Sequence, residues 1–421
     1  MIAAVAIFVL AYLLIAFPNT RLLPVGRAGA ALIGAVAMVA SGALDLPTAL
    51  ASISGETLLL LFGMMVLSDG LIRGGALDWL AGRAARHPGP VHVAAARRFL
   101  IVLSVGSALL SAFLVNDTIC LVFTPAVVLL CERLGLSYAP YLLALASSAN
   151  LGSAATLVGN PQNMLIGSMS GLSFGAFVGR SLVAVTVAVA LNIALLLWLY
   201  RGARLLRGAS TAANAASSLA SQAPSPFPDA ARLPAVVFIG VVAAFFGGVA
   251  LPLAAVAGAG ALLLLRRDDA DDAVRAVDWP LLVFFAGLFV LVEGLRATGL
   301  VDAVFAAAGS ALALDSAGGV AAFTAFSTVG SNIVSNVPLV AVLGPSLGGL
   351  GGSASVETGW VLLAFTSTVA GNLTLVGSVA NLIVAEKARS HYALGFMEYL
   401  RFGVLSTLLS LLVGVPLLFL F

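Results

Sequence analysis

The sequence has very few charged residues. Asp, Glu, Lys and Arg make up 9% of its 421 residues, whereas apolar residues make up 61%, and the mean hydropathy is +1.12. Soluble domains carry about 25% charged residues, so this composition excludes an ordinary soluble domain and predicts a polytopic membrane protein. The net charge of +2 forms no basic run, which argues against nucleic acid as a partner.

Cysteine and histidine are also scarce. Cys120 and Cys131 lie in apolar segments without CxxC spacing, and the three histidines show no metal-ligand spacing. These observations argue against a disulfide framework and against a zinc site. No set of nucleophile, base and orienting residue is visible either, so we expect neither an enzyme nor a bound cofactor.

Apolar runs of membrane-spanning length fill most of the chain, because a bilayer core of about 30 Å takes about 20 helical residues. Two segments, 99–131 and 317–351, are too long for one crossing and have polar or Gly/Pro breaks near their centres. Each predicts a re-entrant helical hairpin, with its tip at Asn116 or Asn336. The N-terminal run has no basic region or cleavage site, so it is expected to stay as the first span. The ten predicted spans are 2–18, 22–42, 57–74, 138–168, 174–200, 233–249, 250–265, 280–296, 357–386 and 396–421.

The placement of arginine predicts the orientation of the chain. Arg21, Arg27, Arg73 and the other loop arginines fall on one side of a plan with ten spans, and the positive-inside rule puts that side in the cytoplasm. Both termini are then expected outside the inner membrane. A cytoplasmic Ser/Pro-rich linker at 208–232 divides the chain into two halves, 1–207 and 233–421.

The same short motifs recur in both halves. Asn116 and Asn336 are each followed nine residues later by proline, at an offset of 220 residues. The motif TLVG begins at Thr156 and again at Thr374, at an offset of 218, with an asparagine four residues beyond each copy. A third pair, DGL and EGL, lies at an offset of 224. This collinear order indicates an internal repeat, and the span count makes the two copies inverted, as in many secondary transporters.

Each TLVG motif lies late in a span that we expect to be a broken helix, 138–168 in the first half and 357–386 in the second. Gly159, Asn160 and Pro161 do not continue a regular helix comfortably, so the helix should unwind there. Unwound backbone at membrane depth is tolerated around a wet site, where half-helix N-termini and freed carbonyls bind a solute or an ion. We therefore expect two hairpin tips and two breaks to form one central site, although single Ser and Thr residues are equally typical of helix packing.

Asp117 is the most informative candidate residue. An intramembrane carboxylate costs at least ~2.5 kcal/mol unless it is paired, hydrated or protonated, and Asp117 has no basic partner in its own hairpin. It is therefore a candidate proton carrier, a ligand for Na⁺, or a group that binds the solute. It is alternatively a structural acid that caps the second limb of its hairpin. The second half has Val337 at the matched position, so the repeat is chemically asymmetric.

Four segments resemble the ion transporter superfamily, and within it the arsenite permease family and the related silicic-acid efflux transporters of plants. They read VNDTICLVFTP, SSANLGSAATLVGNPQNMLIG, VGSNIVSNVPLVAVLGP and STVAGNLTLVGSVANLIVAEKA. The resemblance implies an all-α polytopic fold with two inverted-topology repeats, about ten transmembrane spans, two re-entrant hairpins and two broken helices. It also implies scaffold and transport domains, a homodimer, and secondary active transport by alternating access.

The hairpin tips differ from those of the sodium-coupled dicarboxylate branch of the superfamily, which carries Ser-Asn-Thr at both. Here the tips read Val115-Asn116-Asp117 and Ser335-Asn336-Val337. This difference argues against a dicarboxylate substrate, and the Asn-Asp pair resembles the arsenite permease tip, for which proton coupling is expected. The predicted substrate- or ion-binding residues are Asn116, Asp117, Thr118, Ser153, Thr156, Gly159, Asn160, Asn163, Ser335, Asn336, Asn372, Thr374, Gly377, Ser378 and Asn381.

These observations lead to one function and one alternative. The first is proton-coupled efflux of a small, neutral metalloid oxyacid (arsenite, antimonite or silicic acid), with Asp117 exchanging the proton, because the predicted site has amides and hydroxyls but no arginine. The alternative is a Na⁺-coupled importer of an inorganic or organic anion, with Na⁺ beside the hairpin tips and the anion at helix N-termini. A passive channel fits less well, because two opposed hairpins resemble gates around one site.

Overall fold

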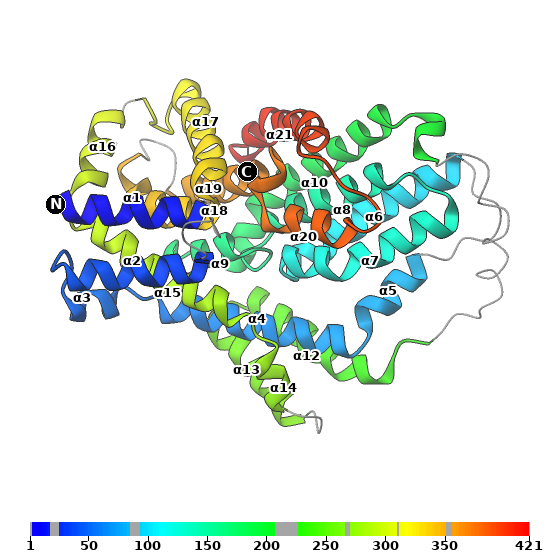
Figure 1. Cartoon of the computed structure of the whole chain (residues 1–421), viewed down its shortest axis with the longest axis horizontal. Coiled ribbons are helices and arrows are strands. Elements are labelled where there is room, and N and C mark those ends of the chain that lie inside the picture. Colours follow the sequence, from blue (N-terminus) through cyan, green and yellow to red (C-terminus); the bar gives the residue numbers. More distant parts are fainter. Residues whose placement is uncertain are drawn as a thin grey trace.

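The computed structural model describes residues 2–16, 25–84, 93–206, 226–265, 270–309, 311–350 and 356–420 (Figure 1). Within these ranges the regular elements are helices, and one isolated bridge joins Leu136 to Leu206. Seven of the helices are long and apolar enough to cross a membrane on their own. The prediction of an all-α polytopic membrane protein is therefore confirmed. Part of the predicted linker, 208–225, and its flanking residue Arg207 lie outside the described residues.

The helices of the first half match the predicted spans closely. The differences are short helices in the connections, such as α3 and α5, which the span count did not include. The bounds are α1 Ile2–Ala16, α2 Arg27–Ala40, α3 Leu46–Ala51, α4 Gly55–Arg73, α5 Ala76–Ala84, α6 Val93–Phe113, α7 Asn116–Leu134, α8 Tyr138–Ser153, α9 Pro161–Met169 and α10 Phe174–Leu199, followed by the 3₁₀ turn η1 Gly202–Leu205.

The second half repeats this order of elements. Its first helix, α12, begins at Asp229, inside the predicted linker, because an acid in the first turn and its ion pair with Arg232 at 2.9 Å favour an earlier start. The bounds are α12 Asp229–Phe246, α13 Leu251–Leu265, α14 Ala270–Arg275, α15 Trp279–Arg296, α16 Leu300–Ala308, α17 Ala317–Val334, α18 Asn336–Leu343, η2 Gly344–Gly349, α19 Val356–Ala370, η3 Leu375–Gly377, α20 Val379–Ala388 and α21 Phe396–Leu418.

Both predicted hairpins are helix–turn–helix units with their tips at the predicted asparagines. α6 and α7 are joined at Leu114 and Val115, so α7 begins at Asn116. α17 and α18 are joined by Ser335 alone, whose φ of 72° lies in the left-handed region that disfavours side chains other than glycine. We refer to residues 115–117 as the first tip and to residues 335–337 as the second tip.

Both predicted broken helices are interrupted. The first break, residues 154–160, separates α8 from α9, and the second break, residues 371–378, separates α19 from α20. α9 restarts because Asn160 caps it, with its side-chain oxygen accepting from the backbone N–H of Asn163 at 2.9 Å, and because Pro161 occupies the first helical position. The breaks therefore lie where glycine, proline and capping residues predicted them.

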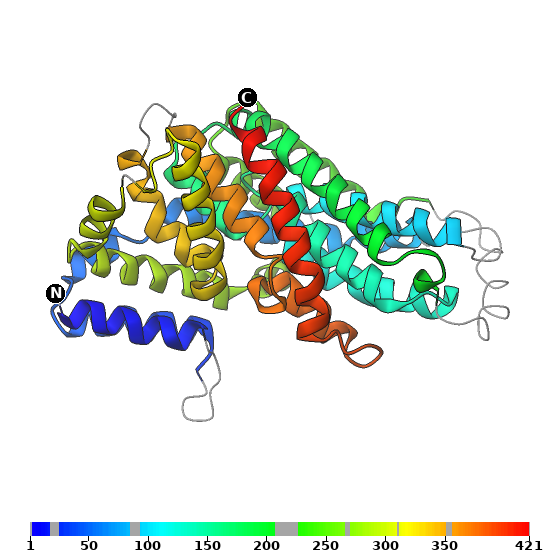
Figure 2. The ribbon, with the colours of Figure 1, turned by 90° about the horizontal axis from the view of Figure 1, so that it is seen from above.

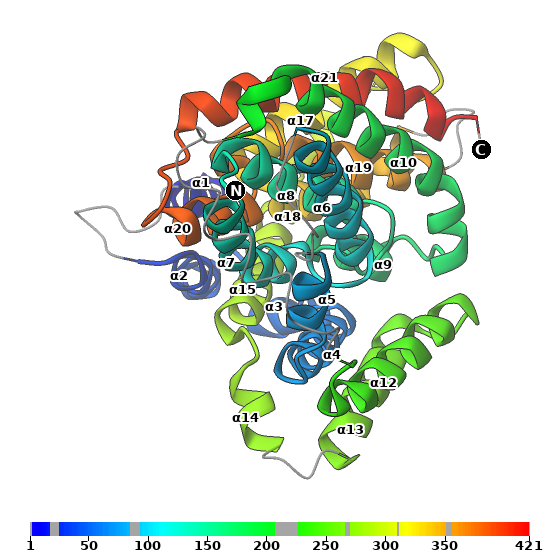
Figure 3. The ribbon, with the colours of Figure 1, turned by 90° about the vertical axis from the view of Figure 1, so that its right-hand side faces the viewer.

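The packing follows the internal repeat, and helices of each half pack against helices of the other. The second helix of each hairpin packs on the helix that follows the break in the opposite half, α7 on α20 and α18 on α9. In the same way α2 packs on α15, and α13 packs on α4. α10 and α21 cross the bundle together, which is clearest from above and from the side (Figures 2 and 3).

Two glycines show that the contacts between the halves are repeated residue by residue at the offset of the repeat. A Cβ on Gly287 of α15 would lie 2.7 Å from the carbonyl carbon of Ala31 on α2. A Cβ on Gly63 of α4 would lie 2.6 Å from the carbonyl carbon of Ala255 on α13. The two pairs are related by an offset of 224 residues, the same offset as the DGL and EGL motifs. Small residues let these helix backbones approach, as is common in membrane bundles.

Candidate functional site

A cavity of about 520 Å³, which we call the first cavity, lies where the two tips meet the second break. Its wall includes the starts of α2, α9, α15 and α20, so it is lined by several helix N-termini. Such N-termini carry partial positive charge and unpaired N–H groups. The predicted site residues that line it are Asn116, Asp117, Ser335, Asn336, Gly377 and Ser378.

The predicted residues of the first break form a supporting layer behind this cavity. The side-chain amide of Asn160 donates to the Ser153 hydroxyl at 2.8 Å, and that of Asn163 donates to the Thr156 carbonyl at 2.9 Å. The Thr156 hydroxyl donates to the Ala112 carbonyl on α6. The break is thus held by buried side chains bonded to its own backbone, which replaces the lost helical hydrogen bonds.

The predicted residues of the second break are held in a similar way. The side-chain amide of Asn381 donates to the carbonyls of Gly371 at 2.7 Å and Thr374 at 3.1 Å. The Thr374 hydroxyl donates to the side chain of Asn332 on α17 at 3.0 Å, so the break is tied to the second hairpin. Because Asn381 and Asn163 have the same role at an offset of 218, the two TLVG motifs are structurally equivalent.

The first tip lies between the two breaks. The backbone N–H of Asn116 donates to the carbonyl of Gly159 in the first break at 3.1 Å. Its side-chain amide donates to Asn150 at 2.9 Å, and Asn150 in turn is bonded to the second break. Thr118, which was also predicted, is half-buried one turn into α7 and does not line the first cavity.

Asn150 is a residue that the motif comparison missed. It lies in the last turns of α8 and is 2% exposed. At the offset of 218 its counterpart is Thr368, which accepts hydrogen bonds from Asn160 and Gln162 at 3.2 Å each. The two residue types differ, so a search for identical repeated residues passes over this position. Its signal in the sequence is a further asparagine in the predicted span, six residues before the TLVG motif begins.

Arg27 corrects the expectation of a site without arginine. Arg27, the first residue of α2, lines the first cavity together with Asp117 and with Asp278, the N-cap of α15. The sequence placed Arg27 in a loop beside the membrane, whereas the packing of α2 against α15 of the other half brings it to the mouth of the cavity. The cavity thus holds two acids and one guanidinium.

Asp117 is half-buried at the second position of α7. Its carboxylate is also close to the backbone N–H of Ala380, in the first turn of α20. Two helix N-termini from opposite halves of the chain therefore lie beside one acid, and both favour negative charge there through their dipoles. The N-cap of α7 is Val115 and no side chain makes a capping hydrogen bond there, so the capping alternative for Asp117 is not supported; its carboxylate lies at the contact between the halves, and the residue lines the first cavity.

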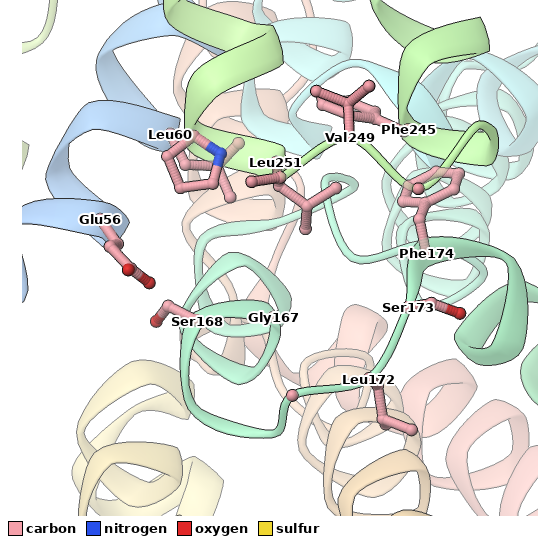
Figure 4. Close-up of a pocket in the computed structure, with 14 residues that line it drawn as sticks. Glu56, Leu60, Gly167, Ser168, Leu172, Ser173, Phe174, Phe245, Val249 and Leu251 are labelled. Atoms are coloured by element: carbon pink, nitrogen blue, oxygen red, sulfur yellow. The ribbon is translucent and has the colours of Figure 1, made fainter.

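A second cavity, of about 370 Å³, lies at the other end of α9 (Figure 4). α9 has Pro161 and Gln162 of its first turn in the first cavity and Gly167 and Ser168 of its last turn in the second, about 10 Å away at 1.5 Å per residue. Glu56 and Leu60, from the first turns of α4, also line it.

The two cavities are related by the internal repeat. Residues 26–28, Pro280 and Phe284 line the first cavity, and the residues that match them at an offset of 224 line the second. The matched residues are Ala250, Leu251, Pro252, Glu56 and Leu60. In the second cavity the hydroxyls of Thr57 and Ser168 lie 2.6 Å apart, and the hairpin tips line only the first cavity.

Comparisons with known proteins agree with this architecture. The sequence model of the citrate transporter family matches residues 10–370. The chain is 32% identical to the putative transporter arsB of Dictyostelium discoideum, over 94% of this chain and 88% of that protein. It is 33% identical to the silicon efflux transporter LSI3 of Oryza sativa subsp. japonica, over 96% of this chain and 95% of that protein.

A solved structure has the same fold. The YdaH transporter of Alcanivorax borkumensis aligns with 98% of this chain and 95% of its own chain, with a TM-score of 0.59 at 15% sequence identity. The family match covers most of the sequence, and the relatives align over nearly its full length. This multi-pass membrane protein therefore belongs to the citrate transporter family, within the ion transporter superfamily that its four motifs resemble.

Proposed function

We propose that this protein is a proton-coupled exporter of small, neutral metalloid oxyacids, arsenite or antimonite or silicic acid, that works by alternating access. The observation that carries the proposal is the position of Asp117, which lines one cavity together with both hairpin tips. A carboxyl group beside two hairpin tips is placed to exchange a proton whenever the cavity opens to one side of the membrane.

The charges in the first cavity favour a neutral solute. When Asp117 is ionised, Asp117 and Asp278 outnumber the single guanidinium of Arg27, so a multiply charged anion would meet net repulsion in that state. The remaining polar groups are amides and hydroxyls, among them Asn116, Asn336 and Ser378. These groups both donate and accept hydrogen bonds, which suits an uncharged acid with several O–H groups.

The names of two relatives support this solute class. The rice protein is named a silicon efflux transporter and the Dictyostelium protein a putative arsB transporter. Both align with nearly the whole chain. The solute of this protein is inferred from its cavity, and the relatives make the same chemical class the first one to test.

The relation between the two cavities supports alternating access. In an inverted repeat, the opposite state is reached when each half adopts the arrangement of the other. The second cavity is then the counterpart of the first on the other side of the membrane, and it is the smaller of the two, with the Thr57–Ser168 contact beside it. In the orientation that the arginines predict, the first cavity lies on the cytoplasmic side, where an exporter takes up its solute.

The decisive experiment measures transport in proteoliposomes with arsenous acid and silicic acid as solutes. We expect a proton gradient to drive uptake into vesicles whose protein is oriented inside out, and we expect Asp117→Asn to remove this dependence. Transport that is unaffected by both the gradient and the substitution would contradict proton coupling. The same vesicles test orientation in the inner membrane, and the mass of the purified protein tests the predicted homodimer.

A second candidate is a Na⁺-coupled importer of an inorganic or organic anion. The description of the matching family and the presence of Arg27 in the cavity favour it. Thermal stabilisation of the purified protein by citrate, sulfate or phosphate in the presence of Na⁺ would support this candidate. Stabilisation by silicic or arsenous acid that is independent of Na⁺ would support the first proposal instead.

A further inference from the structure

Asn150 uses its whole hydrogen-bonding capacity to join the first tip to the second break. Its amide nitrogen donates to Asn372 Oδ1 at 3.0 Å and to Asn381 Oδ1 at 2.9 Å. Its amide oxygen accepts from Asn116 Nδ2 at 2.9 Å and from the Ser378 hydroxyl at 3.0 Å. A neutral amide has two N–H donors and two lone pairs, so no group of Asn150 remains free.

Backbone carbonyls determine which way these amides point. Asn372 donates its nitrogen to the Ser147 carbonyl at 3.1 Å, and Asn381 donates to the carbonyls of Gly371 and Thr374. A carbonyl oxygen only accepts, so both side chains must turn their Oδ1 atoms toward Asn150. Asn150 must then meet them with its nitrogen, which leaves its oxygen for Asn116.

The consequence reaches the first cavity through Asn116. Because its nitrogen is bound to Asn150, the side-chain oxygen of Asn116 is the group left over, and it is buried without a partner among the described residues. Asn116 is 5% exposed and lines the first cavity, whereas Asn150 does not line it. An unpaired buried acceptor is costly, so its presence at the tip calls for an explanation.

The second tip shows that this arrangement is specific to the first. There Ser331 donates its hydroxyl to Asn336 Oδ1 at 2.9 Å, so the matched acceptor is satisfied. Ser111 stands at the position of Ser331 at the offset of 220, but within the described part of the chain its hydroxyl also has no partner. The amide oxygen of Asn116 in the first tip is therefore unpaired, whereas the matched oxygen of Asn336 in the second tip accepts a hydrogen bond from Ser331.

We infer that Asn150 is a positioning residue that fixes the amide of Asn116 with its oxygen unpaired, so that the first tip selects solutes that donate a hydrogen bond. An undissociated oxyacid donates through its O–H groups, whereas a fully ionised anion such as sulfate only accepts. The hydrogen bonds from Asn150 to Asn372 and Asn381 in the second half thereby fix the orientation of the Asn116 amide, which contacts the solute in the first half. This inference rests on the proposed function, because it assumes that Asn116 contacts the solute.

The test compares two ligands in purified protein reconstituted in lipid nanodiscs. Silicic acid is the neutral donor and sulfate is the anion that only accepts, and the dissociation constant of each is measured by calorimetric titration at neutral pH. In Asn150→Leu the Asn116 amide is free to turn. We expect silicic acid to bind about tenfold more weakly, the loss of about one oriented hydrogen bond, and sulfate to bind no more weakly than before.

The internal repeat supplies a matched control. Thr368→Val removes a buried acceptor of two amide hydrogen bonds at the equivalent position, but Thr368 has no contact with Asn116 among the described hydrogen bonds. We expect it to lower the unfolding temperature and to leave the ratio of the two dissociation constants unchanged. Asn150→Thr retains an acceptor in the same place and should recover part of the wild-type ratio of the silicic acid and sulfate dissociation constants. It replaces Asn150→Leu if that variant does not fold.

Two results would overturn the inference. One is a fall of both affinities by the same factor in Asn150→Leu, and the other is an equal change of the ratio in Thr368→Val. If the wild-type protein binds sulfate and not silicic acid or arsenous acid, the proposed function fails, and the inference fails with it because the tip then accepts a ligand without a donor. A wild-type protein that binds silicic acid with an unchanged ratio in every variant contradicts only the role of Asn150.

Discussion

The hydroxyls of Thr57 and Ser168 lie 2.6 Å apart and join the start of α4 to the end of α9 at the second cavity. The matched elements, the start of α15 and the end of α20, both belong to the second half of the repeat, and of the two only the start of α15 lines the first cavity. If the halves exchange arrangements during transport, this contact must open in every cycle.

The double variant Thr57→Cys/Ser168→Cys tests this gate. We expect oxidation to cross-link the two cysteines and stop transport in proteoliposomes, and reduction to restore it, because the second cavity cannot open while α4 and α9 are joined. The wild-type protein is a suitable control, since its Cys120 and Cys131 are buried. Full transport by protein shown to be cross-linked would rule out an opening at this contact.

Asp117→Asn tests proton coupling. We expect silicic acid or arsenous acid still to bind, because the amide has the shape of the protonated carboxyl group and, like it, both donates and accepts hydrogen bonds. Accumulation driven by a pH gradient should fall to the level of empty liposomes. Asp69→Asn is the matched control, because Asp69 is paired with Arg73 at 2.8 Å on α4 and does not line the first cavity. An equal loss in both variants would show that the effect is structural.

Arg27→Gln separates a neutral solute from an anion. If the solute is neutral, we expect its dissociation constant to change by no more than about twofold at fixed pH, since the amide still donates hydrogen bonds. If the solute is an anion held by the guanidinium, loss of a charged hydrogen bond should weaken binding about tenfold or more. Titration of citrate, sulfate and silicic acid into both proteins distinguishes the cases, with Arg73→Gln as a control outside the cavity.

Gly152→Ala tests the close packing of α6 on α8, which supports the first hairpin. A Cβ at Gly152 would overlap the backbone of Ala108, so we expect a loss of about 1–3 kcal/mol of unfolding free energy and a lower unfolding temperature. The control is Gly106 on α6, where an added Cβ would meet no atom within 4 Å. Gly106→Ala should therefore be neutral or slightly stabilising. Equal unfolding temperatures for the two variants would contradict this packing.

The positions of the helices were predictable because lipid leaves the backbone few options. A chain that crosses a bilayer must satisfy its own hydrogen bonds, so apolar length, glycine, proline and capping residues locate spans and interruptions directly. The breaks at residues 154–160 and 371–378 and the tips at Asn116 and Ser335 follow from such local signals. The repeated motifs in turn indicated the inverted repeat, although the role of each predicted site residue stays a prediction.

The composition of the site depended on contacts between distant segments. Arg27 has the sequence context of a loop arginine, and it enters the cavity only because α2 packs on α15 from the other half. Asn150 resembles a packing residue until its four hydrogen bonds are seen. The partners that define each role lie far away in the sequence, so reasoning from local pattern could not assign it.

By itself, therefore, the sequence determined a membrane protein of two inverted repeats with two hairpins, two broken helices and a buried acid at one tip. Tertiary structure alone decided that Asn150 joins the tip of one half to the broken helix of the other, that Arg27 and Asp117 line one cavity, and that the amide oxygen of Asn116 is buried without a partner among the described residues. The physical reason is that hydropathy and capping act over single helices, whereas hydrogen-bond direction and charge pairing depend on which helices meet.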